Sequence, residues 1–121
     1  MRILLVEDHA AVADISCSLL REVHEHEVAH VGTGAAALAA IDKFRPDLVL
    51  LDLNLPDTSG YEVARQLRRA PRYDETLLVA LTGFGNDVDP VRAREVGFDA
   101  HFRKPMDFAV LPSITRGARP A

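Results

Sequence analysis

The sequence predicts a doubly wound α/β domain, in which helices cover both faces of a parallel sheet. Three short apolar runs, at residues 3–6, 48–51 and 77–81, are almost continuous rather than alternating. Strands that are buried on both faces have this pattern. Segments with helical spacing of apolar residues lie between the runs. Because strand and helix alternate along the whole chain, the doubly wound architecture is the one expected.

The elements follow one another in order along the chain. Two weaker strand candidates, residues 27–31 and 100–102, are polar enough to lie at an edge of the sheet or to be short. Apolar residues three or four apart predict three helices. These residues are Val12, Ile15, Leu19 and Val23, then Leu38, Ile41 and Phe44, then Val63 and Leu67. A fourth helix is expected to begin after Asp89 as N-cap, with Pro90 at its first position, and to end at Gly97.

The chain is expected to form one domain over residues 1–121, with an irregular end. A helix that starts at Asp107 would place Pro112 too deep, because the proline ring would meet an earlier carbonyl group. The last helix is therefore predicted to be kinked at Pro112, or short with a start near Leu111. Residues 116–121 are predicted to be a frayed tail.

Composition excludes several classes of protein. Fourteen basic and eighteen acidic residues give a net charge of −4, the wrong sign for a domain that holds nucleic acid by its own charge. Cys17 is the only cysteine, so a disulfide-stapled scaffold is excluded. No apolar run approaches the roughly 20 residues that span a bilayer, and the first residues lack the features of a signal peptide. A cytoplasmic domain without membrane contact is expected.

The polar residues that follow the strands are the candidate site. In a doubly wound sheet, ligands bind outside the carboxyl ends of the strands. Glu7 and Asp8 follow the first predicted strand, Asp52 the third, Thr82 the fourth and Lys104 the fifth. Three carboxylates, a hydroxyl and an ammonium group are therefore predicted to gather at one edge of the sheet.

This set of groups suits phosphoryl transfer. Crowded carboxylates stay ionised only beside a compensating cation, and oxygen ligands suit Mg²⁺. Asp8 and Asp52 are expected to bind the ion directly, and the longer Glu7 through water. An aspartate carboxylate is also a nucleophile that forms aspartyl phosphates, which gives Asp52 a second role. Thr82 is expected to donate a hydrogen bond to one phosphoryl oxygen, and Lys104 to pair with another.

Four short motifs occur in this order within residues 2–107. They are Val6-Glu7-Asp8, Asp52-Leu53-Asn54-Leu55-Pro56 with Gly60, Leu81-Thr82-Gly83, and Arg103-Lys104-Pro105. Together they resemble the receiver domain of two-component response regulators. The resemblance implies a flavodoxin-like fold, with a five-stranded parallel sheet in the order 2-1-3-4-5. It also implies a phosphoacceptor signalling domain rather than an enzyme.

The resemblance implies a role for each candidate residue. Asp52 becomes the phosphoacceptor. Glu7, Asp8 and Asp52 become the carboxylate ligands of Mg²⁺ or Mn²⁺, with the backbone carbonyl of Asn54 as a further ligand.

The third and fourth motifs would sense the phosphoryl group. By the same resemblance, Thr82 and Lys104 contact the phosphoryl oxygens, and the Lys104–Pro105 peptide bond is cis. The switch position three residues before the lysine, commonly Tyr or Phe in this family, is occupied by His101. Thr82 and His101 are expected to move together on phosphorylation.

The implied partner is a histidine kinase or a histidine phosphotransfer protein, with no direct contact to nucleic acid or membrane. Self-association is expected to be absent or weak, through the face of the fourth helix, fifth strand and fifth helix. Residues 97–101, before Lys104, resemble the receivers of hybrid histidine kinases. A stand-alone receiver and a piece of a longer regulator stay open as alternatives.

Two other functions fit part of the sequence. Gly32-x-Gly34-x-x-Ala37 imitates a dinucleotide-binding fingerprint, and Asp52 lies twenty residues after Gly32. This alternative leaves the acidic pair and the lysine unexplained. The second alternative is a Mg²⁺-dependent phosphohydrolase with an aspartate nucleophile, since Asp52-Leu53-Asn54 is similar to a DxD motif. Such an enzyme needs an acid where Asn54 stands.

Overall fold

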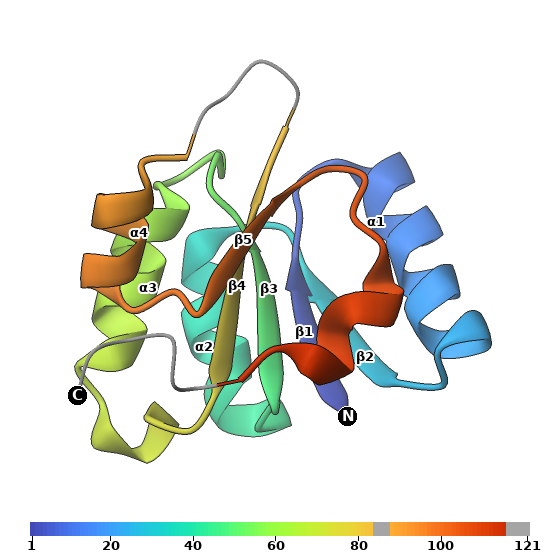
Figure 1. Ribbon diagram of the computed structural model, residues 1–121, viewed down its shortest axis with the longest axis horizontal. Helices are drawn as coiled ribbons and strands as arrows, with labels where there is room; N and C mark the ends of the chain where they lie inside the picture. The colour runs from blue at the N-terminus through green and yellow to red at the C-terminus, as the bar shows by residue number, and fades with distance from the viewer. Residues whose placement is uncertain (84–87, 116–121) are drawn as a thin grey trace.

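The computed structural model describes residues 1–83 and 88–115 and contains one parallel sheet (Figure 1). Its strands are β1 (Arg2–Val6), β2 (Glu27–Val31), β3 (Leu48–Asp52), β4 (Leu77–Thr82) and β5 (Ala100–Arg103). The order across the sheet is β2-β1-β3-β4-β5, and all neighbours are parallel. The predicted fold class and strand order are therefore confirmed.

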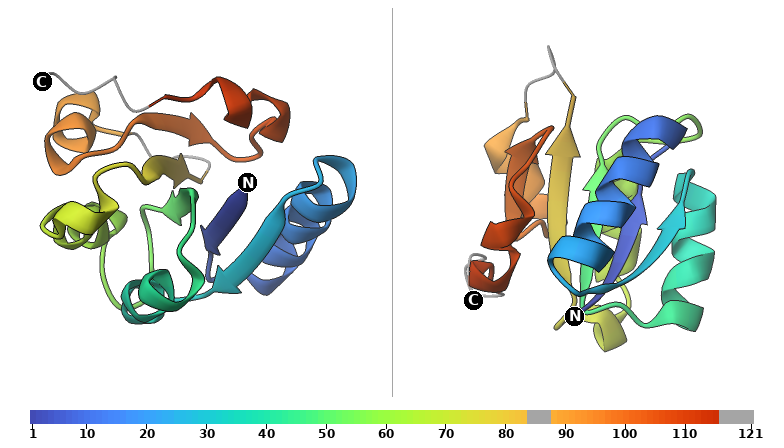
Figure 2. Two further views of the ribbon diagram at one scale, coloured as in Figure 1. Left: turned by 90° about the horizontal axis from the view of Figure 1, so that it is seen from below. Right: turned by 90° about the vertical axis from the view of Figure 1, so that its right-hand side faces the viewer.

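Helices cover both faces of the sheet (Figure 2). They are α1 (Ala10–Ser18), the π-helical turn η1 (Leu19–Val23), α2 (Gly34–Phe44), α3 (Gly60–Arg68), the 3₁₀ turn η2 (Pro71–Tyr73), α4 (Pro90–Val96) and the 3₁₀ helix η3 (Phe108–Ser113). One face carries α1 and η3, and the other carries α2, α3 and α4. No helix of the described ranges has the length and apolar character needed to cross a membrane.

The two faces bury separate apolar cores, and successive residues of one strand contribute to opposite cores. On β1, Leu4 packs towards α2 and α3, whereas Ile3 and Leu5 pack towards α1 and η3. This arrangement explains why the strand runs are continuous rather than alternating in hydrophobicity. It also fixes the central strands rigidly at the edge where the polar residues lie.

The apolar stripe that predicted the first helix runs over α1 and η1, and it is not the face that packs on the sheet. Its four members are between 37% and 64% exposed, and they are Val12, Ile15, Leu19 and Val23. The buried residues of this segment are Ala13, Cys17 and Leu20. The helix is thus apolar over a wider arc than the sheet covers, and part of that arc faces outwards.

The ends of the later helices follow local sequence chemistry. The Asp89 carboxylate accepts hydrogen bonds from the amides of Val91 and Arg92, at 3.1 and 3.2 Å. Pro90 is the first residue of α4, and Gly97 ends the helix with φ of 107°. The predicted bounds of this helix are therefore confirmed.

The last helix was predicted either to be kinked at Pro112 or to be short with a start near Leu111. In the structure it is a short 3₁₀ helix that contains Pro112, but it begins at Phe108 rather than near Leu111, with Asp107 as its N-cap. A 3₁₀ helix of this length needs few internal hydrogen bonds, so one missing amide proton is tolerated. The predicted tail at residues 116–121 lies outside the described residues.

Candidate functional site

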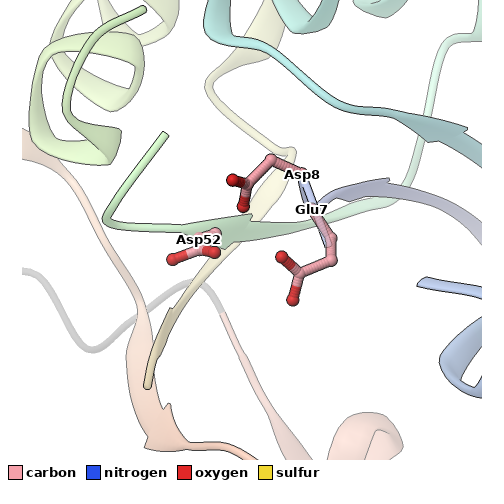
Figure 3. A group of neighbouring side chains, drawn as sticks. All are labelled: Glu7, Asp8 and Asp52. Carbon is pink, nitrogen blue, oxygen red and sulfur yellow. The ribbon is translucent and has the colours of Figure 1, made fainter. Parts of the chain in front are cut away.

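Three carboxylates meet at the carboxyl ends of β1 and β3 (Figure 3). Glu7 and Asp8 directly follow β1, and Asp52 is the last residue of β3. Because the two strands are parallel neighbours, their ends lie side by side. One carboxylate oxygen from each residue lies within 4.8 Å of the others.

Lys104 joins two of these carboxylates. Its Nζ atom lies 2.5 Å from Glu7 Oε1 and 2.8 Å from Asp52 Oδ2. Glu7 and Asp52 are buried, at 2% and 4% exposure, whereas Asp8 is exposed. Three ionised carboxylates and one ammonium group have a net charge of −2, which one divalent cation would balance.

Burial and ion pairing act together on the ionisation of this group. Burial raises the pKa of the Glu7 carboxyl, although hydrogen bonds from Lys104 and from the His9 amide oppose the change. Burial also disfavours the Lys104 ammonium, but its hydrogen bonds to Asp52 and Glu7 outweigh burial and leave its pKa raised. Lys104 therefore stays charged, and its charge depends on these two partners.

Backbone hydrogen bonds fix the orientation of the carboxylates. The amide of Asn54 donates to Asp52 Oδ1 at 3.0 Å, and the amide of His9 donates to Glu7 Oε2 at 3.2 Å. The ring of His30 donates from Nε2 to the backbone carbonyl of Glu7 at 2.7 Å, since a carbonyl oxygen can only accept. The contact of His30, on the neighbouring strand, is a feature that sequence reasoning missed.

Thr82 offers a hydroxyl group at the same edge. The residue is 1% exposed, and its Oγ1 atom has no hydrogen-bond partner among the residues that the structure describes. Its backbone carbonyl accepts a hydrogen bond from the Lys104 amide at 2.8 Å, which holds the ends of β4 and β5 together. A buried hydroxyl that lacks a partner is costly, so this group suits a ligand oxygen.

The remaining predicted residues lie on and after β5. The Lys104–Pro105 peptide bond is cis. His101 pairs with Ala80 of β4 in the sheet, and its side chain is exposed. It lines a shallow hollow that also contains Thr82. The structure thus brings Glu7, Asp8, Asp52, Thr82 and Lys104 to one edge, with His101 beside them.

The donor set fits a hard divalent cation. The candidate ligands are carboxylate oxygens and, by the resemblance, the backbone carbonyl of Asn54, and Mg²⁺ prefers such oxygen ligands. The Glu7 carboxylate is occupied by Lys104 and the His9 amide. The Asp52 carboxylate is occupied in the same way, by Lys104 and the Asn54 amide, whereas Asp8 is exposed.

The dinucleotide alternative does not fit the structure. A pyrophosphate would need the free amides at the start of α2. The amides of Gly34 and Ala35 instead donate to the two carboxylate oxygens of Asp57, at 2.8 and 3.0 Å. A Cβ atom on Gly34 would lie 2.4 Å from the methyl carbon of Thr58. The glycine is thus explained by contact with a loop of this chain.

Comparison with known proteins gives the same family over nearly the whole chain. Residues 3–116 match the family model of the response regulator receiver domain. The transcriptional regulatory protein AfsQ1 of Streptomyces coelicolor is 36% identical over 115 residues, which cover 94% of this chain and 49% of that protein. The DNA-binding response regulator MtrA of Mycobacterium tuberculosis is 40% identical over 104 residues, which cover 86% of this chain and 44% of that protein. The chain thus spans about half the length of these curated relatives.

Solved structures agree with the family match. A response regulator receiver domain from Methylobacillus flagellatus is 38% identical, with a TM-score of 0.80 and coverage of 93% of this chain and 94% of that one. The signal receiver domain of a signal transduction histidine kinase from Syntrophus aciditrophicus is 31% identical, with a TM-score of 0.77 and coverage of 93% of this chain and 84% of that one. The curated relatives above are named as regulators rather than as hybrid kinases. The phosphohydrolase and dinucleotide alternatives find no support.

Proposed function

Because the chain belongs to the response regulator receiver domain family, we propose that Asp52 accepts a phosphoryl group from a phosphohistidine donor in a Mg²⁺-dependent reaction. One observation carries this proposal. Lys104 holds Asp52 and Glu7 together beside an exposed Asp8 and the Thr82 hydroxyl, which has no hydrogen-bond partner within residues 1–83 and 88–115. The proposed acceptor Asp52, the lysine that balances its charge, and a hydroxyl that can bind a phosphoryl oxygen therefore lie at one edge of the sheet.

In the proposed reaction, a carboxylate oxygen of Asp52 attacks the phosphorus atom of the donor. The bond between phosphorus and the donor imidazole nitrogen breaks, and its electron pair leaves with the imidazole. Lys104 pairs with one phosphoryl oxygen, and the Thr82 hydroxyl donates to another. The hydrogen bond from Lys104 Nζ to Asp52 Oδ2, at 2.8 Å, supports this role of the lysine.

The proposed metal ligands are Glu7, Asp8, Asp52 and the backbone carbonyl of Asn54. Mg²⁺ or Mn²⁺ bound there would neutralise the charge of the incoming phosphoryl group. Asp52 is kept in place by the Asn54 amide, and Glu7 by the His9 amide and Lys104. These hydrogen bonds prepare the carboxylates before the donor arrives.

Phosphorylation is proposed to act as a switch through Thr82 and His101. The aspartyl phosphate carries a charge of about −1.5 to −2, in place of the single carboxylate charge. The Thr82 hydroxyl turns towards the new oxygens, and His101 follows from its exposed position on β5. The surface formed by β4, β5 and α4 then changes its preference for partners by a shift in population.

The donor is proposed to be a histidine kinase or a histidine phosphotransfer protein that docks on α1. The exposed apolar stripe of α1 lies beside the site, and a groove between α1 and the segment after β5 reaches from Ile15 to Lys104 and Glu7. An apolar partner surface seated there would lie next to Asp52. The proposed setting is the cytoplasm, with no contact of this domain with nucleic acid or membrane.

Self-association is proposed to be absent or weak, through α4, β5 and η3. Over the described residues, the fifth helix of this face is the short 3₁₀ helix η3. We infer that the full-length protein is a response regulator like its curated relatives, rather than a hybrid kinase.

Intact mass spectrometry after incubation with acetyl phosphate and Mg²⁺ tests the central claim. Wild type is expected to gain one phosphoryl group, and Asp52→Asn none. Chelation of the metal should also abolish the gain. Asp42→Asn removes an exposed carboxylate of α2 and serves as the control, with a wild-type yield. Equal yields from wild type and Asp52→Asn would refute the proposed function.

A further inference from the structure

The loop between β3 and α3 carries Asn54, and it is anchored at two places. At its base, Asn54 and Ser59 form an antiparallel bridge, and the Gly60 amide donates to the carbonyl of Leu53 at 2.9 Å. At its tip, both oxygens of the Asp57 carboxylate accept hydrogen bonds from the start of α2. The contacts at the base connect the loop only to the end of its own strand, β3, and to the start of α3. The contacts at the tip connect it to a different element, α2.

The tip contact is specific and close-packed. The Thr58 methyl carbon packs closely against Gly34. A Cβ atom on residue 34 would lie only 2.4 Å from this methyl carbon, so no larger residue fits there without a shift. The carboxylate also complements the positive end of the helix dipole. Accordingly, the hydrogen bonds from the Gly34 and Ala35 amides hold the pKa of the Asp57 carboxyl below its usual range. An exposed side chain is thus held in one orientation.

From this geometry we infer that Asp57 is a positioning residue for the divalent cation: by fixing the loop to α2, it holds the backbone of Asn54 at the metal site. This inference rests on the proposed function, which makes the Asn54 carbonyl a ligand. The Asn54 amide already donates to Asp52 Oδ1, so a displaced loop would disturb the ligand and the acceptor together. Groups that orient metal ligands typically change metal affinity by about 10–100-fold when they are removed.

Isothermal titration of folded protein with Mg²⁺ alone tests the inference. Asp57→Ala removes both hydrogen bonds and is expected to weaken Mg²⁺ binding by about tenfold. Asp57→Asn keeps one acceptor oxygen, and it is expected to bind more tightly than Asp57→Ala but more weakly than wild type. Both variants lose the same charge, so equal affinities for the two would show a purely electrostatic effect and overturn the inference.

A second pair of variants approaches the same contact from α2. Gly34→Ala places a Cβ atom against Thr58 and is expected to weaken Mg²⁺ binding as well. Adding Thr58→Ser removes the nearer of the two methyl groups that the new Cβ atom meets, and it is expected to restore part of the affinity; the other, Val63 Cγ2, would still lie 2.9 Å from that atom. A Gly34→Ala protein that binds Mg²⁺ as tightly as wild type would contradict the anchoring argument.

Asp42→Asn is the matched control, because it removes one negative charge from the same helix without a contact to this loop. Its Mg²⁺ affinity is expected to equal that of wild type. Unchanged affinity in Asp57→Ala, with Mg²⁺ bound by wild type, would overturn this inference alone. A wild-type protein that binds no Mg²⁺ would instead overturn the proposed function and this inference with it.

Discussion

Lys104 supplies the positive charge that allows Glu7 and Asp52 to remain buried side by side. Removal of one partner of a buried ion pair is costly because it leaves an uncompensated charge. The lysine is 22% exposed at its side chain, so water reduces this cost. Lys104→Met is expected to lower the free energy of unfolding by about 2 kcal/mol at neutral pH.

Mg²⁺ should reverse part of this loss, because the cation replaces the missing charge beside the same carboxylates. Urea melts of wild type and Lys104→Met, each with and without Mg²⁺, measure both effects. A larger metal-dependent stabilisation in the variant than in wild type is expected. If Mg²⁺ stabilises neither protein, the three carboxylates do not form a metal site.

Asp57 makes stability depend on pH in a direction that follows from its contacts. The amides of Gly34 and Ala35 hold the pKa of its carboxyl below the ordinary value. A carboxyl with a lowered folded pKa stabilises the protein above its unfolded pKa, of about 3.9, and this contribution is lost as pH falls through the folded pKa. Wild type should therefore lose more stability on acidification than Asp57→Asn.

Carboxyl-carbon NMR resolves the titration of Asp57 directly, and urea melts from about pH 5 to pH 3 measure the stability of both proteins. The two curves of stability against pH are expected to converge towards acid. Parallel curves, or a carboxyl that titrates at the ordinary value, would show that the two hydrogen bonds are not maintained in solution.

Sequence reasoning found the site residues that follow buried strands but missed those whose partners depend on tertiary contact. Glu7, Asp8 and Asp52 could be placed together because parallel strands end at one edge. Asp57 gave no such signal, since its partners lie 23 and 22 residues away on another helix. The glycine that accompanies this contact, Gly34, was instead consistent with a phosphate-binding loop.

At the scale of elements, a buried ion pair fastens α3 to the connection between α4 and β5. Arg68 at the end of α3 lies 3.1 Å from Asp99, and their side chains are 7% and 0% exposed. The guanidinium also donates to the carbonyls of Gly97 and Tyr73, and Asp99 accepts from the Leu78 amide at 2.9 Å. The pair therefore joins α3, η2, β4 and the start of β5.

Breaking this pair is expected to be strongly destabilising. Arg68→Met leaves a buried carboxylate without this partner and should lower the free energy of unfolding by about 3 kcal/mol. Asp99→Asn should also destabilise, and the double variant should lose less than the sum of the two single losses. Denaturant melts of wild type, the two single variants and the double variant measure the coupling free energy between Arg68 and Asp99. Additive losses would show that the ion pair contributes nothing beyond packing.

A helix whose ends are marked by local capping residues was predicted correctly. For the other helices, contacts beyond the local sequence decided where the helix starts or which face is buried. The caps at Asp89 and Gly97 fixed α4, because both act through neighbouring backbone groups. The last helix could not be placed, since Asp107 as N-cap favours an early start and Pro112 opposes continuation; a 3₁₀ helix satisfies both. For α1, spacing predicted the helix but could not indicate which side of a wide apolar arc the sheet would cover.

At the scale of the whole molecule, the sheet separates the surface proposed to receive the donor from the surface proposed to respond to phosphorylation. The exposed apolar stripe of α1 lies on one face, and α4 lies on the other (Figure 2). The proposed phosphoryl site, at Asp52, lies between them, at the edge that both faces share. Chemistry at Asp52 and docking of a protein donor are therefore separable by mutation.

Ile15→Lys tests this separation, with Val91→Lys as a matched control. Ile15 on α1 and Val91 on α4 are 64% and 66% exposed, so either change should alter stability by no more than about 0.5 kcal/mol. Acetyl phosphate is too small to need a docking surface, and all three proteins should accept its phosphoryl group at the same rate. With a histidine kinase first shown to phosphorylate wild type, Ile15→Lys should be phosphorylated at least about tenfold more slowly, because a desolvated ammonium group opposes an apolar contact. Val91→Lys should keep the wild-type rate. If Val91→Lys is instead phosphorylated slowly by the kinase while Ile15→Lys keeps the wild-type rate, the donor docks on the opposite face.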